Sequence, residues 1–228
     1  MIKKYCIIAF VILCIVFSFF PKLDIIFVQN FYHEQLDFIY RDHPAAIASF
    51  KLVPIITVTW GAICGAYLVY ALWKGKKILS SPAMYLLVAA LLGPGLFVNY
   101  GLKEHSGRAR PKHILEFGGD KAFTAPLIIA DQCDHNCSFS SGHAAMGYYF
   151  SAISYVISAP YRNIAFIAGV ALGSIIGFGR VLQGGHFLSD VLFSGLFIMI
   201  TNHLCFLLWH KLTRSRAPRG QKRRRKLG

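Results

Sequence analysis

Six long apolar stretches constrain this chain more than any other feature of its sequence. A helix that crosses a bilayer needs about 20 predominantly apolar residues, because the hydrocarbon layer is about 30 Å thick. Four of the stretches meet that length, and the first and fifth reach it once flanking residues are counted. We therefore predict an all-α integral membrane protein that forms a single six-span bundle over residues 1–228. The stretches are Tyr5–Phe20, Leu52–Trp73, Pro82–Leu102, His143–Pro160, Asn163–Phe178 and Phe187–Trp209.

The composition agrees with a membrane protein. Hydrophobic residues make up 55% of the chain and charged residues only 15%, whereas a soluble domain has about 25% charged residues. This composition excludes a disordered, collagenous or disulfide-scaffold chain. The first stretch follows Lys3 and Lys4, as in a signal peptide, but Ser18 is the only small residue near its end. We therefore expect an uncleaved anchor.

The distribution of charge predicts the topology. If the N-terminus is cytoplasmic, 15 of the 24 basic residues fall in cytoplasmic segments, and all ten acidic residues lie outside or at the outer end of a span. Basic residues accumulate on the cytoplasmic side of membrane proteins, so both termini are expected there. The basic tail, residues 210–228, is interpreted as a topogenic charged segment, with contact to anionic lipid headgroups as the alternative. We expect neither nucleic-acid binding, despite the net charge of +14, nor an obligate protein partner.

The outer segments contain two further features. Residues 21–51 alternate apolar and polar side chains, which predicts either an amphipathic helix in the interface or a loop packed on the bundle. In the long outer loop, 103–142, Cys133 and Cys137 lie four positions apart. A disulfide is the favoured interpretation in an oxidising compartment. The alternatives are free thiols, or a metal site in which His135 is a further ligand. The other four cysteines lie within spans and are expected to be packing residues.

Three clusters of polar residues fall at the outer face. The first contains Lys103, Arg108, Arg110 and Lys112, whose charges suit a bound phosphate, although such bases also extend toward lipid headgroups at an interface. The second, Ser141, Gly142 and His143, begins the fourth span. The free N–H groups of a helix start bind phosphate oxygens, but an ordinary serine cap beside an interfacial histidine fits as well.

The third cluster contains Arg180, His186 and Asp190. His186 and Asp190 are four apart and therefore share one helix face. A carboxylate that accepts a hydrogen bond from one imidazole nitrogen leaves the other nitrogen as a nucleophile, although a purely structural pair would have the same spacing. Together the clusters supply cations, a nucleophile with its orienting group and a proton donor, which are the parts needed for phosphoryl transfer. No metal cage accompanies them, so we expect the cations to fill that role without a cofactor.

The three clusters, in their order and spacing, resemble the three-part signature of the type 2 phosphatidic acid phosphatase superfamily. Ser140 and Gly179 depart from the usual pattern, where proline and serine are common, and neither change removes a catalytic side chain. The resemblance implies metal-independent hydrolysis through a phosphohistidine. It implies that His186 attacks phosphorus, Asp190 orients it and His143 protonates the leaving group, while the phosphate is held by Lys103, Arg110, Ser141, Gly142 and Arg180. Arg108 and Lys112 are expected as additional headgroup contacts.

The expected substrate is an amphiphile with a phosphate group, because the site lies at the boundary of the bilayer. The outer loop is most similar to those of bacterial lipid A phosphatases, which implies removal of the 1- or 4′-phosphate of lipid A at the periplasmic face of the inner membrane. Undecaprenyl pyrophosphate and phosphatidylglycerophosphate are the alternative substrates. A non-catalytic lipid-binding or transport protein is a third interpretation. Because one histidine must start neutral and the other protonated, we expect a bell-shaped pH profile.

Overall fold

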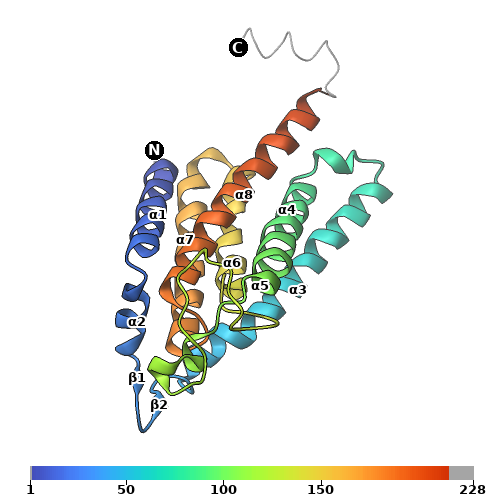
Figure 1. Cartoon of the computed structure of the whole chain (residues 1–228). Coiled ribbons are helices and arrows are strands. Elements are labelled where there is room, and N and C mark those ends of the chain that lie inside the picture. Colours follow the sequence, from blue (N-terminus) through green and yellow to red (C-terminus); the bar gives the residue numbers. More distant parts are fainter. Residues whose placement is uncertain (1, 216–228) are drawn as a thin grey trace.

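The structure, a computed structural model, describes residues 2–215, and the rest of the expected basic tail lies outside this range. Long helices run alongside one another, and the loops that connect them gather at the two ends of the bundle (Figure 1). The start of α1 and the end of α8 lie at one end, whereas the long loop after α5 lies at the other. The longest helices are α1 (Ile2–Phe19), α3 (Pro44–Trp73), α7 (Arg162–Leu182) and α8 (Leu188–Ser215).

The described residues contain four helices that are long and apolar enough to cross a membrane, and five spans if one bent helix pair is counted. The expected span at residues 143–160 is not among them. It forms α6 (Gly142–Tyr149) followed by a 3₁₀ segment, η5 (Phe150–Tyr155). Helix α6 packs against α3, α7 and α8 and is buried along most of its length. A helix that is enclosed by other helices is apolar on all sides, which explains why this short segment resembled a full span.

The segment between the first two long helices packs on protein. Helix α2 (Lys22–Gln29) meets α1 at 100°. Its Asp24 and Val28 are fully buried, so the face of α2 that carries these two residues is turned toward the bundle. A short hairpin follows, with β1 (Tyr32–His33) antiparallel to β2 (Asp37–Phe38). Helix α3 begins eight residues before the apolar stretch, because His43 caps it by accepting a hydrogen bond from the Ala45 N–H at 3.3 Å.

The third expected span is one continuous helix, in which α4 (Pro82–Ala90) passes into a π-helical segment, η2 (Leu91–Leu102), and then α5 (Lys103–His105). Proline cannot donate the backbone hydrogen bond that an α-helix requires. The helix widens here instead of ending, and the Asn99 amide donates to the Pro94 carbonyl at 2.8 Å. Lys103 is thereby placed at the loop end of the bundle. The remaining short elements are η1 (Ile78–Ser80), η3 (Pro111–His113), η4 (Leu115–Phe117) and η6 (Ala159–Tyr161).

A stripe of glycines on α7 allows α6 and η5 to approach closely. A Cβ atom on Gly169 would lie 2.2 Å from the Ser151 nitrogen, and one on Gly173 would lie 2.4 Å from the Tyr148 ring. Small residues spaced four apart permit such backbone contact between helices in membranes. This packing brings the beginning of α6 beside the end of α7, which is where two of the three polar clusters lie.

Candidate active site

The three polar clusters converge on one cavity at the loop end of the bundle. The cavity has a volume of about 450 Å³. Lys103 reaches it from α5, His143 from the first turn of α6, Arg180 from the end of α7 and His186 from the α7–α8 connection. Its lining contains one acidic residue, Asp42, against six basic ones. A cavity of this charge suits an anion. The basic residues are Arg41, Lys51, Lys103, Arg110, Lys112 and Arg180.

The connection between α7 and α8 places His186 and Arg180 side by side. Gly184 has a positive φ of 61°, a conformation typical of the glycine that ends a helix, and its N–H donates to the Val181 carbonyl at 2.9 Å. A Cβ on Gly185 would lie 2.5 Å from the Arg180 guanidinium, so only glycine leaves room for that side chain. The two consecutive glycines therefore turn the chain and bring His186 up to the cavity.

The ring of His186 is held in one orientation. Its Nδ1 lies 2.8 Å from the Ser138 carbonyl oxygen, and a carbonyl only accepts, so Nδ1 carries the proton and Nε2 keeps its lone pair. The expected partner, Asp190, is 3.6 Å from the same Nδ1, which is too long for a hydrogen bond. Ser138, rather than Asp190, therefore fixes the tautomer. Burial lowers the pKa of His186 to about 3, which keeps the ring neutral near pH 7.

Asp190 lies behind His186 in a fully satisfied environment. One oxygen, Oδ2, accepts from the Ser138 hydroxyl at 2.6 Å and from the Phe187 N–H at 2.8 Å. The other, Oδ1, accepts from Arg108 at 2.5 Å. Because these donors fix the carboxylate, its negative charge stays beside the imidazole, where it can stabilise a positive charge that forms on His186.

Arg108 is a correction to the sequence-based expectation of a headgroup contact. Its side chain is only 1% exposed and does not line the cavity. The guanidinium bridges two buried carboxylates, with Nη1 bound to Asp190 and Nη2 bound to Asp24 at 2.9 Å, while Nε donates to the Thr124 carbonyl at 2.9 Å. A buried arginine must be paired, and the acid on α2 that pairs with it is more than 80 residues away in sequence.

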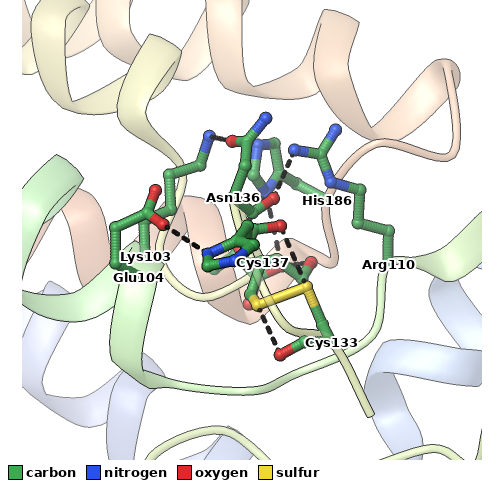
Figure 2. Close-up of a disulfide and its surroundings, with 10 residues drawn as sticks. Lys103, Glu104, Arg110, Cys133, Asn136, Cys137 and His186 are labelled. Carbon is green, nitrogen blue, oxygen red and sulfur yellow. Dashed lines mark hydrogen bonds and ion pairs between the residues drawn. A yellow bond between two sulfur atoms is a disulfide. The ribbon is translucent and has the colours of Figure 1, made fainter.

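Lys103 and Arg110 both donate a hydrogen bond to one residue, Asn136, which the sequence analysis did not single out. The Lys103 ammonium donates to the Asn136 side-chain oxygen at 2.5 Å, and the Arg110 guanidinium donates to the Asn136 backbone oxygen at 2.6 Å. Figure 2 shows both bonds converging on Asn136 from opposite sides. Asn136 lies in the turn closed by a disulfide between Cys133 and Cys137, whose Cα atoms are 5.6 Å apart.

Arg180 is fixed from a different direction. Its Nη1 donates to the side-chain oxygen of Gln183, and its guanidinium lies over the Phe50 ring, 4.7 Å from the centroid. The same ring stacks on His143, with centroids 5.0 Å apart. His143 Nε2 is buried and has no hydrogen-bond partner within residues 2–215. An unpartnered ring nitrogen at the wall of a cationic cavity is available to a bound anion or to its leaving group.

Ser141 and Gly142 lie beneath the cavity rather than on its wall. Both are buried, and neither belongs to the cavity lining. The Ser141 hydroxyl caps α6 by accepting from the Ala144 N–H at 3.4 Å, and its own N–H donates to the Asp190 carbonyl at 3.3 Å. A Cβ on Gly142 would lie 2.2 Å from the Asn99 side-chain oxygen, which explains the glycine at this position.

Ser138, Asn136 and Asp24 therefore contribute to the site, although the sequence analysis assigned none of them a role there. Serine and asparagine are common in any polar loop, and nothing in their local sequence separates them from their neighbours. Asp24 did have a signal, because a charged residue among apolar ones is costly unless it is paired. The identity of its partner depends on how α2 packs.

Comparison with known proteins finds a matching family and similar proteins. The profile of the PAP2 superfamily matches residues 82–215. A Lipid A 4′-phosphatase of Francisella tularensis subsp. novicida is 35% identical over 201 residues, which cover 86% of this chain and 90% of that protein. A Lipid A 4′-phosphatase of Rhizobium leguminosarum is 32% identical, with coverage of 79% and 84%. A third, from Rhizobium etli, is 42% identical over 46% of this chain and 41% of its own. No solved structure matches the chain significantly.

Proposed function

Since this chain belongs to the PAP2 superfamily and is a phosphoric monoester hydrolase, we propose that it removes the 4′-phosphate of lipid A through a phosphohistidine intermediate. One observation carries the proposal. One cationic cavity contains a neutral His186 and His143, and among residues 2–215 the Nε2 atoms of both rings have no hydrogen-bond partner. These two nitrogens are the nucleophile and the proton donor that cleavage of a phosphate ester requires.

Phosphate binding is assigned to Lys103, Arg110 and Arg180, with help from Lys112, which also lines the cavity. Lysine has three N–H donors and arginine five, so each cation retains donors for phosphate after its bond to Asn136 or Gln183. Preorganised cations stabilise the charge that develops on the oxygens in the transition state. We assign this role to the protein's own cations and expect hydrolysis to proceed without a metal cofactor.

In the first step, the Nε2 lone pair of His186 attacks phosphorus and forms a P–N bond. The P–O bond to the sugar breaks, its electron pair stays on the sugar oxygen, and His143 supplies the proton that converts this oxygen to a hydroxyl. In the second step, His143 takes a proton from water as the water oxygen attacks phosphorus. The P–N bond then breaks, its electron pair returns to His186 and inorganic phosphate leaves. Asp190 stabilises the imidazolium between the two steps.

We further propose that the chain crosses the bacterial inner membrane six times, with both termini cytoplasmic and the cavity facing the periplasm. The start of α1 and the end of α8 lie at one end of the bundle (Figure 1), as an even number of crossings requires. α6 and η5 then form the short fourth crossing. The disulfide at the cavity end favours an oxidising compartment. Cysteines introduced at Ser80 and Asp120, tested with an impermeant thiol reagent in intact cells, should react only at Asp120.

Phosphate release by the purified protein in detergent with EDTA tests the function. We expect release from lipid A that carries both phosphates and none from lipid A that lacks the 4′-phosphate. Undecaprenyl pyrophosphate and phosphatidylglycerophosphate serve as competing substrates, and faster release from either would reassign the substrate. His186→Ala should abolish release. His113→Ala, a histidine on the same outer face that does not line the cavity, should retain it. Release that survives His186→Ala would refute the phosphohistidine mechanism.

A further inference from the structure

The turn between Cys133 and Cys137 presents one residue to the cavity. Asn136 adopts a left-handed backbone conformation, with a φ of 53°, and is part of the cavity lining. Among residues with a side chain, asparagine tolerates this conformation best. In Figure 2 the disulfide closes the turn on one side, and Asn136 projects from it between Lys103 and Arg110.

Asn136 is placed to counter the repulsion between the two cations. Like charges in a partly buried site repel more strongly than in water because the effective dielectric constant is lower. Lys103 is only 8% exposed, so solvent screens it poorly. The side-chain carbonyl of Asn136 accepts from Lys103 and its backbone carbonyl accepts from Arg110. One residue thus directs the negative ends of two dipoles at two cations and holds them on the same side of the cavity.

The turn is also anchored to the segment that carries these cations. The Cys137 N–H donates to the Lys103 carbonyl at 3.0 Å, and the Ser138 N–H donates to the Arg108 carbonyl at 2.9 Å. Cys137 is fully buried, so the disulfide ties Cys133 to a fixed point. Asn136 lies directly beside that point. Its position relative to Lys103 is therefore set by a covalent link and by backbone hydrogen bonds.

We propose that Asn136, held by the disulfide-closed turn, is a positioning residue that sets the spacing of Lys103 and Arg110 for the substrate phosphate. This inference rests on the proposed function, because it assigns phosphate binding to those two cations. Asn136 acts through them and leaves their remaining donors free. A neutral amide suits this role, because a carboxylate at the same place would compete with phosphate for both cations.

Asn136→Gly isolates the side-chain contribution. Glycine retains the left-handed backbone and its carbonyl bond to Arg110 but loses the acceptor for Lys103. We expect the affinity for inorganic phosphate, measured by titration calorimetry in detergent, to fall about tenfold, as is typical when a hydrogen bond to a charged group is lost. The KM for lipid A should rise in parallel. Asp134→Gly, an exposed position in the same turn, should bind phosphate as the wild type does.

Asn136→Asp separates positioning from a role in turn structure alone. Aspartate also tolerates the left-handed conformation, so Asn136→Asp keeps the shape of the turn, and a loss of phosphate affinity in this variant comes from its side chain and not from the turn. Positioning predicts a larger loss than for Asn136→Gly, since the new carboxylate would neutralise both cations. The double variant Cys133→Ser with Cys137→Ser should also weaken phosphate binding, because Asn136 is then no longer held. The melting temperature of this double variant is measured in parallel to test whether the fold is retained.

Phosphate affinity equal to that of the wild type in both Asn136 variants overturns the inference, as does an equal loss in Asp134→Gly. If the Asn136 variants weaken phosphate binding while wild-type lipid A hydrolysis is present, both proposals are supported. A wild-type protein that neither binds inorganic phosphate nor hydrolyses lipid A overturns the proposed function and this inference with it. If the wild type hydrolyses lipid A and Asn136→Gly leaves KM and phosphate affinity unchanged, only the inference fails.

Discussion

Substitution of Arg108 tests how this structure is stabilised, because the sequence predicts a contact with the headgroup whereas the structure shows a buried ion pair. The sequence placed it with Lys112 as a headgroup contact, whereas the structure buries it between two carboxylates. Replacement by methionine keeps an unbranched, flexible side chain, although a shorter one, and removes the charge. If Arg108 contacts headgroups, Arg108→Met should raise KM and leave stability unchanged. If it pairs Asp24 with Asp190, the variant should lose stability.

The size of the expected loss of stability in Arg108→Met follows from the contacts of the guanidinium. Arg108 forms ion pairs with Asp24 at 2.9 Å and with Asp190 at 2.5 Å, and all three side chains are at most 1% exposed. Removing one partner of a buried ion pair costs roughly 3–5 kcal/mol, because an uncompensated charge stays buried. Here two carboxylates lose their common partner. In a chain of this size such a loss lowers the melting temperature by on the order of 10 °C.

Arg108→Lys distinguishes charge from geometry. The guanidinium bonds to its two acids through different nitrogens, whereas the ammonium of lysine is a single point of charge and cannot reproduce this fork. We therefore expect Arg108→Lys to melt between the wild type and Arg108→Met. An Arg108→Lys variant as stable as the wild type would show that charge alone is sufficient.

Thermal unfolding in detergent is monitored by circular dichroism, and KM for lipid A is measured for the same variants. Lys112→Met is the matched control. Lys112 lines the cavity, so this variant should raise KM and leave the melting temperature unchanged. The reasoning about Arg108 is refuted if Arg108→Met melts within about 2 °C of the wild type and its KM rises as in Lys112→Met.

Three further predictions concern the proposed nucleophile, His186, and the helix packing. Ser138→Ala removes a hydroxyl that donates to Asp190 at 2.6 Å and should lower kcat about tenfold with little change in KM; an unchanged kcat contradicts this. Since burial lowers the pKa of His186 to about 3, its ring should stay neutral down to pH 5 in an NMR titration, with the acid limb of kcat below that pH. Titration near pH 6.5 would show a solvated ring. A Cβ on Gly147 would lie 2.6 Å from the Gly173 Cα, so Gly147→Ala should destabilise the protein by about 1–3 kcal/mol, measured as a lower melting temperature; an unchanged melting temperature would mean that α6 shifts freely.

The amino-acid sequence was sufficient to predict the class of protein and to propose which polar residues form the site. Apolar length is a property of each segment, so the long helices could be predicted without knowing how they pack. Arg180, His186 and Asp190 lie within eleven residues of one another in the sequence. The structure brings Arg180 and His186 to the same cavity as Lys103 and His143, with Asp190 behind His186. Segment 143–160 differs from the expectation, because apolar length alone does not predict that its α-helix ends at Tyr149 and continues as a 3₁₀ segment.

Which polar residues bind one another depends on how the helices and loops pack and could not be predicted from the sequence. The tautomer of His186 depends on the Ser138 carbonyl, 48 residues away, and the pairing of Arg108 depends on Asp24, 84 residues away. The sequence around a carbonyl or a carboxylate does not indicate which donor will bind it. The donor is chosen when helices pack and loops close, since each buried polar group must then be satisfied by whatever the fold brings within about 3 Å.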